Sequence, residues 1–283
     1  MKEVIVPKTK GDALVNQLGS LYETLKSLKL GEKVKFNLSG LDWTCPLLVL
    51  PLSAYINDTG SSFETSNTRV GSYLSAISFP GGIRTVTSFR RKVQSNKTYV
   101  PISVPKRDNN IERERLETLF MQMLNEILKA GKGTASAIYQ PVGELVTNIF
   151  EHSKRDEGYI FGQFYPKKNY LDICIVDRGR GLSKAYKEEK GLSFSDQRAI
   201  AEAMRGNSTK PNKERGYGLR TSKRIVCEAM GGGFILITGT SALVSVGKKE
   251  QTVQLPNFYW QGVAIAYRIP RPTGPIDIYP YLE

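Results

Sequence analysis

The residues whose types and spacing could do chemistry lie in three short segments of the second half of the chain. The first is a helical stretch, 139–153, with a carboxylate at Glu144 and an amide at Asn148. Four residues apart, they share one helix face, opposite an apolar stripe suited to packing on a sheet. Alone, such a polar face is typical of any solvated helix.

The second segment, Asp177-Arg178-Gly179-Arg180-Gly181, follows the apolar, strand-like run 171–176 directly. A carboxylate at the rim of a sheet can accept a hydrogen bond from an amino group. The glycines beside it would let a flat ring approach the backbone. An aspartate followed by two glycines is also common in simple turns, so this segment alone does not define a site.

The third segment is Gly216-Tyr217-Gly218-Leu219, which opens a helix that runs through Val226. Glycines at a helix N-terminus expose backbone N–H groups and the positive end of the helix dipole to an anion. Two cations just upstream, Lys213 and Arg215, add positive charge. The spacing fits neither a P-loop nor a dinucleotide-binding fingerprint.

Together, the order and spacing of GELVTNIFEH, DRGRG and GYGL resemble the N, G1 and G2 boxes of the GHKL superfamily. That superfamily contains the ATP-binding domains of histidine kinases, anti-sigma-factor serine kinases, DNA gyrase and the Hsp90 chaperone. The resemblance covers about residues 111–270. It is strongest to the anti-sigma-factor kinases, in which a glutamate stands four residues before a metal-binding asparagine.

The resemblance implies a site for ATP and Mg²⁺. By that likeness, Glu144 is the general base, Asn148 the Mg²⁺ ligand and Asp177 the carboxylate that accepts a hydrogen bond from the adenine amino group. Gly179 and Gly181 would let the base lie close to the backbone. The other ATP-binding residues that the likeness implies are Lys213, Arg215, Gly216, Gly218, Leu219 and Arg220.

Other features near the site concern the lid, the last strand and the single histidine. Residues 182–215 correspond to the mobile lid of the superfamily. In members of the superfamily the last strand often begins Gly-Thr, and the threonine helps to hold adenine through a water. Here Gly262 precedes Val263, which has no hydroxyl, so Thr240 is the candidate to supply that hydroxyl instead. The only histidine, His152, is expected to pack at the end of its helix. A histidine autokinase needs an acceptor on a separate helical domain, so histidine autophosphorylation within this chain is not expected.

The elements that must position these segments suggest two α/β units. Residues 1–95 alternate strand and helix signals and predict a small α/β domain. Residues 96–110, basic and without sustained periodicity, predict a linker. Residues 111–283 predict a GHKL (Bergerat) α/β sandwich, with helices on one face of a mixed sheet.

Within the first unit, residues 33–58 resemble the strand–loop–helix centre of STAS-like domains, the fold of anti-sigma-factor antagonists. Those antagonists carry a Ser or Thr phosphoacceptor at the start of the helix. The nearest equivalents here are Thr44 and Cys45, followed by Pro46. The alternative role for Thr44 is that of a helix N-cap.

Composition limits the partners. With 40 Lys+Arg and 27 Asp+Glu, the 283-residue chain has a net charge of +13, which favours polyanions without choosing among nucleotides, nucleic acid and acidic proteins. Its three cysteines form no CxxC, so neither a disulfide framework nor a zinc site is expected. The longest apolar stretch, 45–56, is too short and too interrupted to span a bilayer. No targeting segment is visible, so no membrane contact and a cytoplasmic location are expected.

Three functions remain open. The first is a regulatory protein that binds Mg-ATP and could transfer phosphate to Ser or Thr of a partner or of its own STAS-like unit. The second is a nucleotide-gated interaction module with slow ATP hydrolysis or none, which recruits a protein partner; a homodimer is left open. The third, nucleic-acid binding, rests only on the positive charge and the basic segment 96–110.

Overall fold

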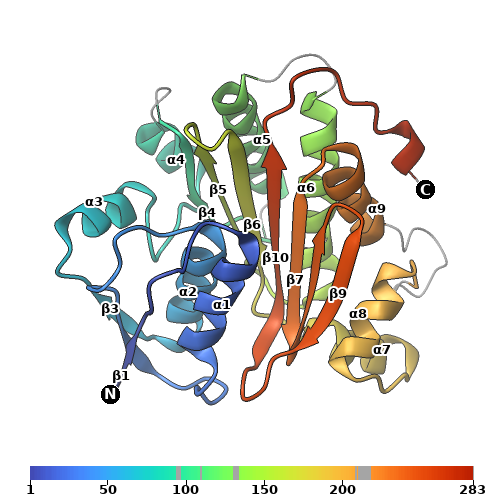
Figure 1. Cartoon of the computed structure of the whole chain (residues 1–283). Helices are drawn as coiled ribbons and strands as arrows, with labels where there is room; N and C mark the ends of the chain where they lie inside the picture. The colour runs from blue at the N-terminus through green and yellow to red at the C-terminus, as the bar shows by residue number, and fades with distance from the viewer. Residues whose placement is uncertain (94–96, 109, 130–133, 208, 210–217, 283) are drawn as a thin grey trace.

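The computed structural model describes the chain except residues 94–96, 109, 130–133, 208, 210–217 and 283. Its described strands form two sheets (Figure 1). One has three parallel strands in the order β1-β2-β3. The other has seven strands in the order β4-β5-β6-β10-β7-β8-β9, and all its strand pairs are antiparallel.

The N-terminal unit is a small α/β structure, as expected. Its strands and first helices alternate along the chain: β1 (Lys2–Ile5), α1 (Leu14–Leu25), β2 (Val34–Asn37), α2 (Pro46–Thr59), β3 (Ser62–Glu64) and α3 (Thr68–Ala76). All residues of α2 from Pro46 to Ile56 are buried, which suits a helix that is apolar all round. Pro46 occupies the first turn of α2, where its missing N–H leaves no hydrogen bond unmade.

The start of α2 differs from the expected N-cap. Cys45, not Thr44, is the N-cap residue, and its side chain makes no capping hydrogen bond. The Thr44 side chain is buried, and its hydroxyl has no hydrogen-bond partner among the described residues. Thr44 therefore does not cap the helix.

The remaining elements form the larger unit. The strands of its sheet are β4 (Tyr99–Ser103), β5 (Tyr159–Tyr165), β6 (Tyr170–Val176), β7 (Gly233–Gly239), β8 (Ser241–Val246), β9 (Lys249–Gln254) and β10 (Trp260–Pro270). Its helices are α4 (Val86–Lys92), α5 (Asn110–Leu128), α6 (Thr134–His152), α7 (Gly181–Lys190), α8 (Asp196–Met204) and α9 (Gly218–Arg224). A π-helical turn, Ile225–Ala229, continues α9, and a 3₁₀ turn, Tyr279–Tyr281, lies near the C-terminus.

Both faces of the large sheet are covered (Figure 1). In β6, Ile173 and Ile175 belong to the core beneath α5, α6 and α9, whereas Cys174 and Val176 belong to the core shared with α1 and α2. Successive side chains of a strand point to opposite faces, so the apolar run of β6 serves both cores. The helices of the larger unit thus cover one face of the sheet and the N-terminal unit covers the other.

The α/β fold class is confirmed, with one difference in the sheet. It was expected to be mixed, but its described pairs are all antiparallel because β5–β6 and β7–β8–β9 are successive hairpins and β10 inserts between β6 and β7. Strand β4 lies inside residues 96–110, where the sequence suggests a linker, and pairs with β5. The domain boundaries themselves remain a prediction.

A buried charged group joins the two units. Asp172 of β6 is 1% exposed and accepts two hydrogen bonds from Arg268, each 2.7 Å long. Gln17 of α1 donates to the same carboxylate at 2.9 Å. A buried carboxylate needs such partners: Arg268 compensates its charge, and Gln17 of α1 supplies a further hydrogen bond from the N-terminal unit.

No helix in the described part of the chain is long and apolar enough to cross a membrane.

Candidate functional site

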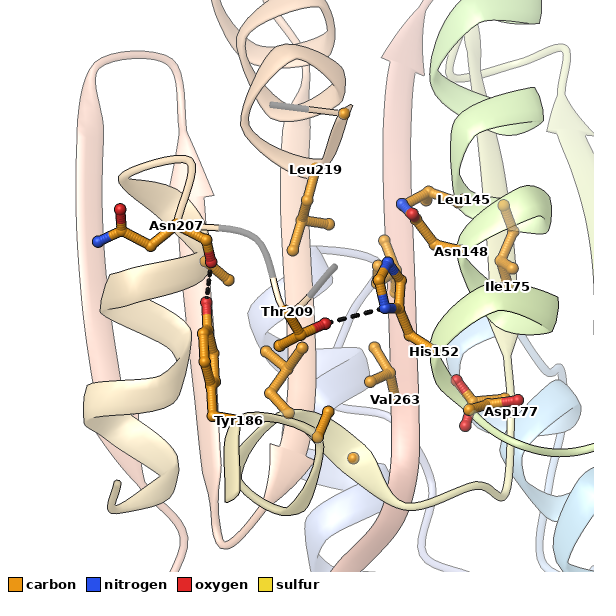
Figure 2. A pocket seen from close by; sticks show the side chains of 17 residues that line it. Leu145, Asn148, His152, Ile175, Asp177, Tyr186, Asn207, Thr209, Leu219 and Val263 are labelled. Atoms are coloured by element: carbon orange, nitrogen blue, oxygen red, sulfur yellow. Dashed lines mark hydrogen bonds between the residues drawn. The ribbon is translucent and has the colours of Figure 1, made fainter. Parts of the chain in front are cut away.

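A cavity lies between α6, the end of β6, the segment after α8 and the start of α9 (Figure 2). Its empty space is about 840 Å³, part of it open to solvent. Much of its wall is apolar. Its polar side chains come from four places: α6 and the residue after it, the end of β6, α7, and the segment after α8. They are Asn148, His152, Ser153, Asp177, Tyr186, Asn207 and Thr209. Mostly apolar walls with a few placed polar groups are usual in small-molecule sites.

Asp177 is the buried acid of this cavity. It is 4% exposed, and the backbone N–H of Gly179 donates to its Oδ1 at 2.7 Å. Burial raises the pKa of its carboxyl to about 7, although the hydrogen bonds from backbone N–H groups oppose the shift. The backbone N–H groups of Gly179 and Val263 are its described backbone partners, and they use only part of the acceptor capacity of a carboxylate. Asp177 can therefore accept a hydrogen bond from a ligand at the cavity wall.

The glycines beside Asp177 are required by the packing of the protein itself. A Cβ on Gly179 would overlap the carbonyl oxygen of Ser153, which follows α6. Gly181 has φ +73°, and a Cβ there would lie 2.9 Å from the hydroxyl of Thr238. Both glycines were expected to make room for a flat ring. Gly181 does line the cavity, whereas Gly179 allows the loop to pack on the end of α6.

The two polar residues of α6 have different surroundings. Asn148 lines the cavity, and its amide makes no hydrogen bond within the described part of the chain. Glu144 does not line the cavity; its carboxylate lies so close to Gly218 that a Cβ there would overlap Oε2. Glu144 is thus beside the N-terminus of α9, where the helix dipole attracts negative charge.

The start of α9 forms another wall of the cavity. Gly218 and Leu219 line it, whereas Arg220 does not. The predicted phosphate contacts Lys213, Arg215 and Gly216 lie outside the described residues. Among the residues that the structure describes, no group of three or more Cys, His, Asp or Glu is placed to hold a metal ion.

His152 and Thr209 form a contact that the sequence did not suggest. His152 ends α6 as expected, but its ring lines the cavity instead of only packing at the helix end. The hydroxyl of Thr209 lies 2.9 Å from His152 Nδ1 (Figure 2). Thr209 is 6% exposed and lies within the expected lid. A hydroxyl in a long polar segment gives no sequence signal for a partner 57 residues away.

The expected lid contains α7 and α8, which Asp196 attaches to the sheet. The Asp196 carboxylate accepts hydrogen bonds from the Thr240 backbone N–H at 2.8 Å, from the Thr240 hydroxyl at 3.0 Å and from the Ser183 hydroxyl. Thr240 does not line the cavity, and its hydroxyl donates to Asp196, so its suggested contact with adenine stays a prediction. Val263 lines the cavity wall at that position.

One comparison with known proteins concerns the part of the chain around this cavity. Residues 133–257 match the family model of the Histidine kinase-, DNA gyrase B-, and HSP90-like ATPase. The matched segment includes Glu144, Asn148, Asp177 and Gly218, so it supports the GHKL superfamily and an ATP-binding domain in this part of the chain. No curated protein and no solved structure matches the sequence.

Proposed function

We propose that this chain is a regulatory protein that binds Mg-ATP in the cavity of Figure 2. The observation that carries the proposal is the buried carboxylate of Asp177, which has acceptor capacity left beyond its backbone partners and lines a cavity that the start of α9 also lines. The first feature suits the amino group of adenine, and the second suits phosphate.

The polar groups of the cavity suit successive parts of a nucleotide, from the adenine ring to the phosphates. The adenine amino group would donate to Asp177, against the apolar wall that includes Val263. The N–H groups of Gly218 and Leu219 would meet the phosphates. The Asn148 amide, which makes no hydrogen bond within the described part of the chain, fits the single oxygen ligand that Mg²⁺ needs when phosphates and water supply the rest.

Glu144 would act as the general base. Its carboxylate lies beside Gly218, at the phosphate end of the cavity, one helical turn before Asn148. There it would take the proton from a water or a hydroxyl group whose oxygen attacks the γ-phosphate, with ADP as the leaving group. A water as attacking group gives an ATPase, and a Ser or Thr hydroxyl gives a protein kinase.

The position of Thr44 favours an acceptor on another protein. Thr44 is 6% exposed and precedes the 14-residue helix α2, whose last turn carries Asp58. Asp58 contacts Arg178, the neighbour of Asp177. Because Thr44 is at the other end of α2, it lies roughly 20 Å from Asp58 along the helix. Phosphorylation of Thr44 within the same chain would require the N-terminal unit to detach. The second candidate, a nucleotide-gated module that hydrolyses ATP slowly or not at all, needs no acceptor in the chain.

Incubation of the full chain with Mg-ATP labelled on the γ-phosphate tests the proposal, with Glu144→Ala as the control. Protein-bound label on the wild type alone establishes a kinase, and free phosphate alone establishes an ATPase or a gated switch. We expect Glu144→Ala to abolish turnover but to keep ATP affinity within about threefold of the wild type, since Glu144 does not line the cavity. Turnover at the wild-type rate in Glu144→Ala would show that the base is another residue.

The gated alternative makes a different prediction. It requires a change in mass or partner binding when a non-hydrolysable ATP analogue is added, which analytical ultracentrifugation would detect. Nucleic-acid binding is tested by a gel shift at low salt, because its affinity would depend steeply on salt.

A further inference from the structure

The side chain of Arg178 leaves the cavity loop and enters the interface with the N-terminal unit. It is 5% exposed, although Arg178 directly follows the cavity residue Asp177 in the chain. Its guanidinium lies 5.0 Å from the ring centroid of Tyr55 on α2 and 4.8 Å from that of Trp260 at the start of β10. The cation is thus in contact with one aromatic ring from each unit.

Its counter-ion also comes from the N-terminal unit. Nε and Nη2 of Arg178 each donate to Oδ2 of Asp58 at 3.3 Å. The other oxygen of Asp58 lies 3.3 Å from Nη2 of Arg155. One carboxylate at the end of α2 therefore neutralises two guanidinium groups that would otherwise repel each other.

The backbone of Arg178 is fixed as well as its side chain. Its carbonyl oxygen accepts hydrogen bonds from Arg155 Nε at 2.9 Å and from Gln261 Nε2 at 3.0 Å. The next N–H, that of Gly179, donates to Oδ1 of Asp177. Movement of Arg178 would therefore shift the N–H that orients the carboxylate of Asp177.

We propose that Arg178 is a positioning residue, through which Asp58 of the N-terminal unit holds Asp177 in the orientation that an adenine amino group requires. The inference rests on the proposed function, because it assumes that Asp177 binds adenine. It assigns a specific task to the N-terminal unit: α2 supplies the only acidic partner of Arg178 within the described part of the chain. By thermodynamic reciprocity, a partner that displaced α2 would weaken ATP binding, and bound ATP would oppose that displacement.

The test compares two nucleotides on the full chain by titration calorimetry. ATP carries the 6-amino group, and purine riboside triphosphate differs from it only by lacking that group. The ratio of the two affinities therefore reports the contact between the 6-amino group and Asp177, because contacts to the ring, ribose and phosphates contribute equally to both. The variant is Asp58→Asn, and the matched control is Glu64→Gln, which removes the carboxylate of the exposed Lys35–Glu64 pair elsewhere in the same unit.

We expect the wild type and Glu64→Gln to prefer ATP about tenfold or more, as suits a hydrogen bond to a charged group. We expect Asp58→Asn to lose most of that preference, with the affinity for purine riboside triphosphate unchanged. Equal weakening of both nucleotides, or an unchanged ratio, would overturn the inference and leave the proposed function standing. A wild type without any preference for ATP would overturn the Asp177 assignment together with the inference.

Circular dichroism establishes that each variant is folded at the temperature of the titration. If Asp58→Asn does not fold, Arg178→Lys takes its place, because it keeps the charge but not the planar group that lies between Tyr55 and Trp260. We expect the same loss of preference from Arg178→Lys, and a wild-type ratio in this variant contradicts the inference.

Discussion

At the scale of single residues, burial of the Asp177 carboxyl costs stability in the same group that we propose binds adenine. Burial raises the pKa of its carboxyl to about 7, so in the empty cavity it is about half protonated at neutral pH. An amino group that donates to the carboxylate favours the charged form. The group that we propose binds adenine is therefore one whose charged form the fold leaves incompletely stabilised.

The pH dependence of ATP binding follows from this. The ionised carboxylate accepts the hydrogen bond much more strongly than the protonated acid, so affinity is full above the pKa and declines as the pH falls through about 7. We expect ATP to bind roughly tenfold more weakly at pH 6 than at pH 8. Calorimetry with Asp177→Asn controls for the ionisation of the nucleotide's own phosphates. Equal pH dependence in variant and wild type would contradict the prediction.

Asp177→Asn should separate binding from stability. In this variant the Gly179 N–H would still donate to the side-chain oxygen. The amide NH₂ would then face the adenine amino group, and because both groups are donors, no hydrogen bond could form between them. We expect ATP affinity to fall by about tenfold or more.

The same variant makes a prediction about stability. The folded-state pKa of Asp177 lies above the unfolded value, so the ionised carboxylate lowers the stability of the wild type as the pH rises from about 4 to 7. Thermal unfolding at pH 8 should show a variant more stable than the wild type, because each pKa unit of the shift corresponds to about 1.4 kcal/mol of free energy of unfolding. A less stable variant would contradict this explanation.

At the scale of elements, the loop after β6 is positioned by its contact with the end of α6. Gly179→Ala would push the loop away from Ser153, because the new Cβ would overlap that carbonyl oxygen. We expect a loss of about 1–3 kcal/mol in the free energy of unfolding, measured by urea denaturation, and weaker ATP binding. The matched control is Gly143→Ala in the middle of α6, whose Cβ would meet no other atom. It should stabilise the chain by up to about 1 kcal/mol.

The lid helices depend on the attachment of α8 to the β7–β8 turn. Asp196→Ala removes the acceptor of the hydrogen bonds from Thr240 and Ser183. Each such bond contributes about 1 kcal/mol, so we expect ATP to dissociate several-fold faster, with little change in association. Stopped-flow fluorescence with a labelled nucleotide measures both rates. Asp42→Ala, which removes one partner of the exposed Lys8–Asp42 pair, should leave both unchanged.

At the scale of the whole molecule, the large sheet is shared by two cores. Its strands send Cys174 and Val176 toward α1 and α2, and Ile173 and Ile175 toward the helices of the ATP-binding domain. Because the same strands serve both cores, neither half can unfold without exposing apolar surface of the other. The two units should therefore behave as one cooperative structure.

Calorimetry provides the test of this cooperativity. We expect a single unfolding transition for the full chain, with coincident loss of signal from the two units. A chain that lacks residues 1–95 should expose the face that includes Phe161 and Ile235, bind a hydrophobic dye and aggregate. Two separated transitions, or a soluble truncated chain that binds ATP normally, would show that the units are independent.

The sequence alone determined the features that depend on local order. The apolar run 171–176 predicted β6 to within one residue, and the helical pattern 139–153 predicted α6 apart from its first five residues, because such patterns reflect burial along one element. The motif spacing identified Asn148, Asp177, Gly181, Gly218 and Leu219, which the fold brings to one cavity.

Only the tertiary structure decided what lies opposite these residues. The partner of Arg178 is Asp58, 120 positions away, and the partner of His152 is Thr209. Strand β4, in a stretch without periodicity, exists because the edge of β5 supplies its hydrogen bonds. Local propensity is encoded in neighbouring residues, whereas contacts between distant segments depend on how the elements pack, and no short pattern in the chain records that packing.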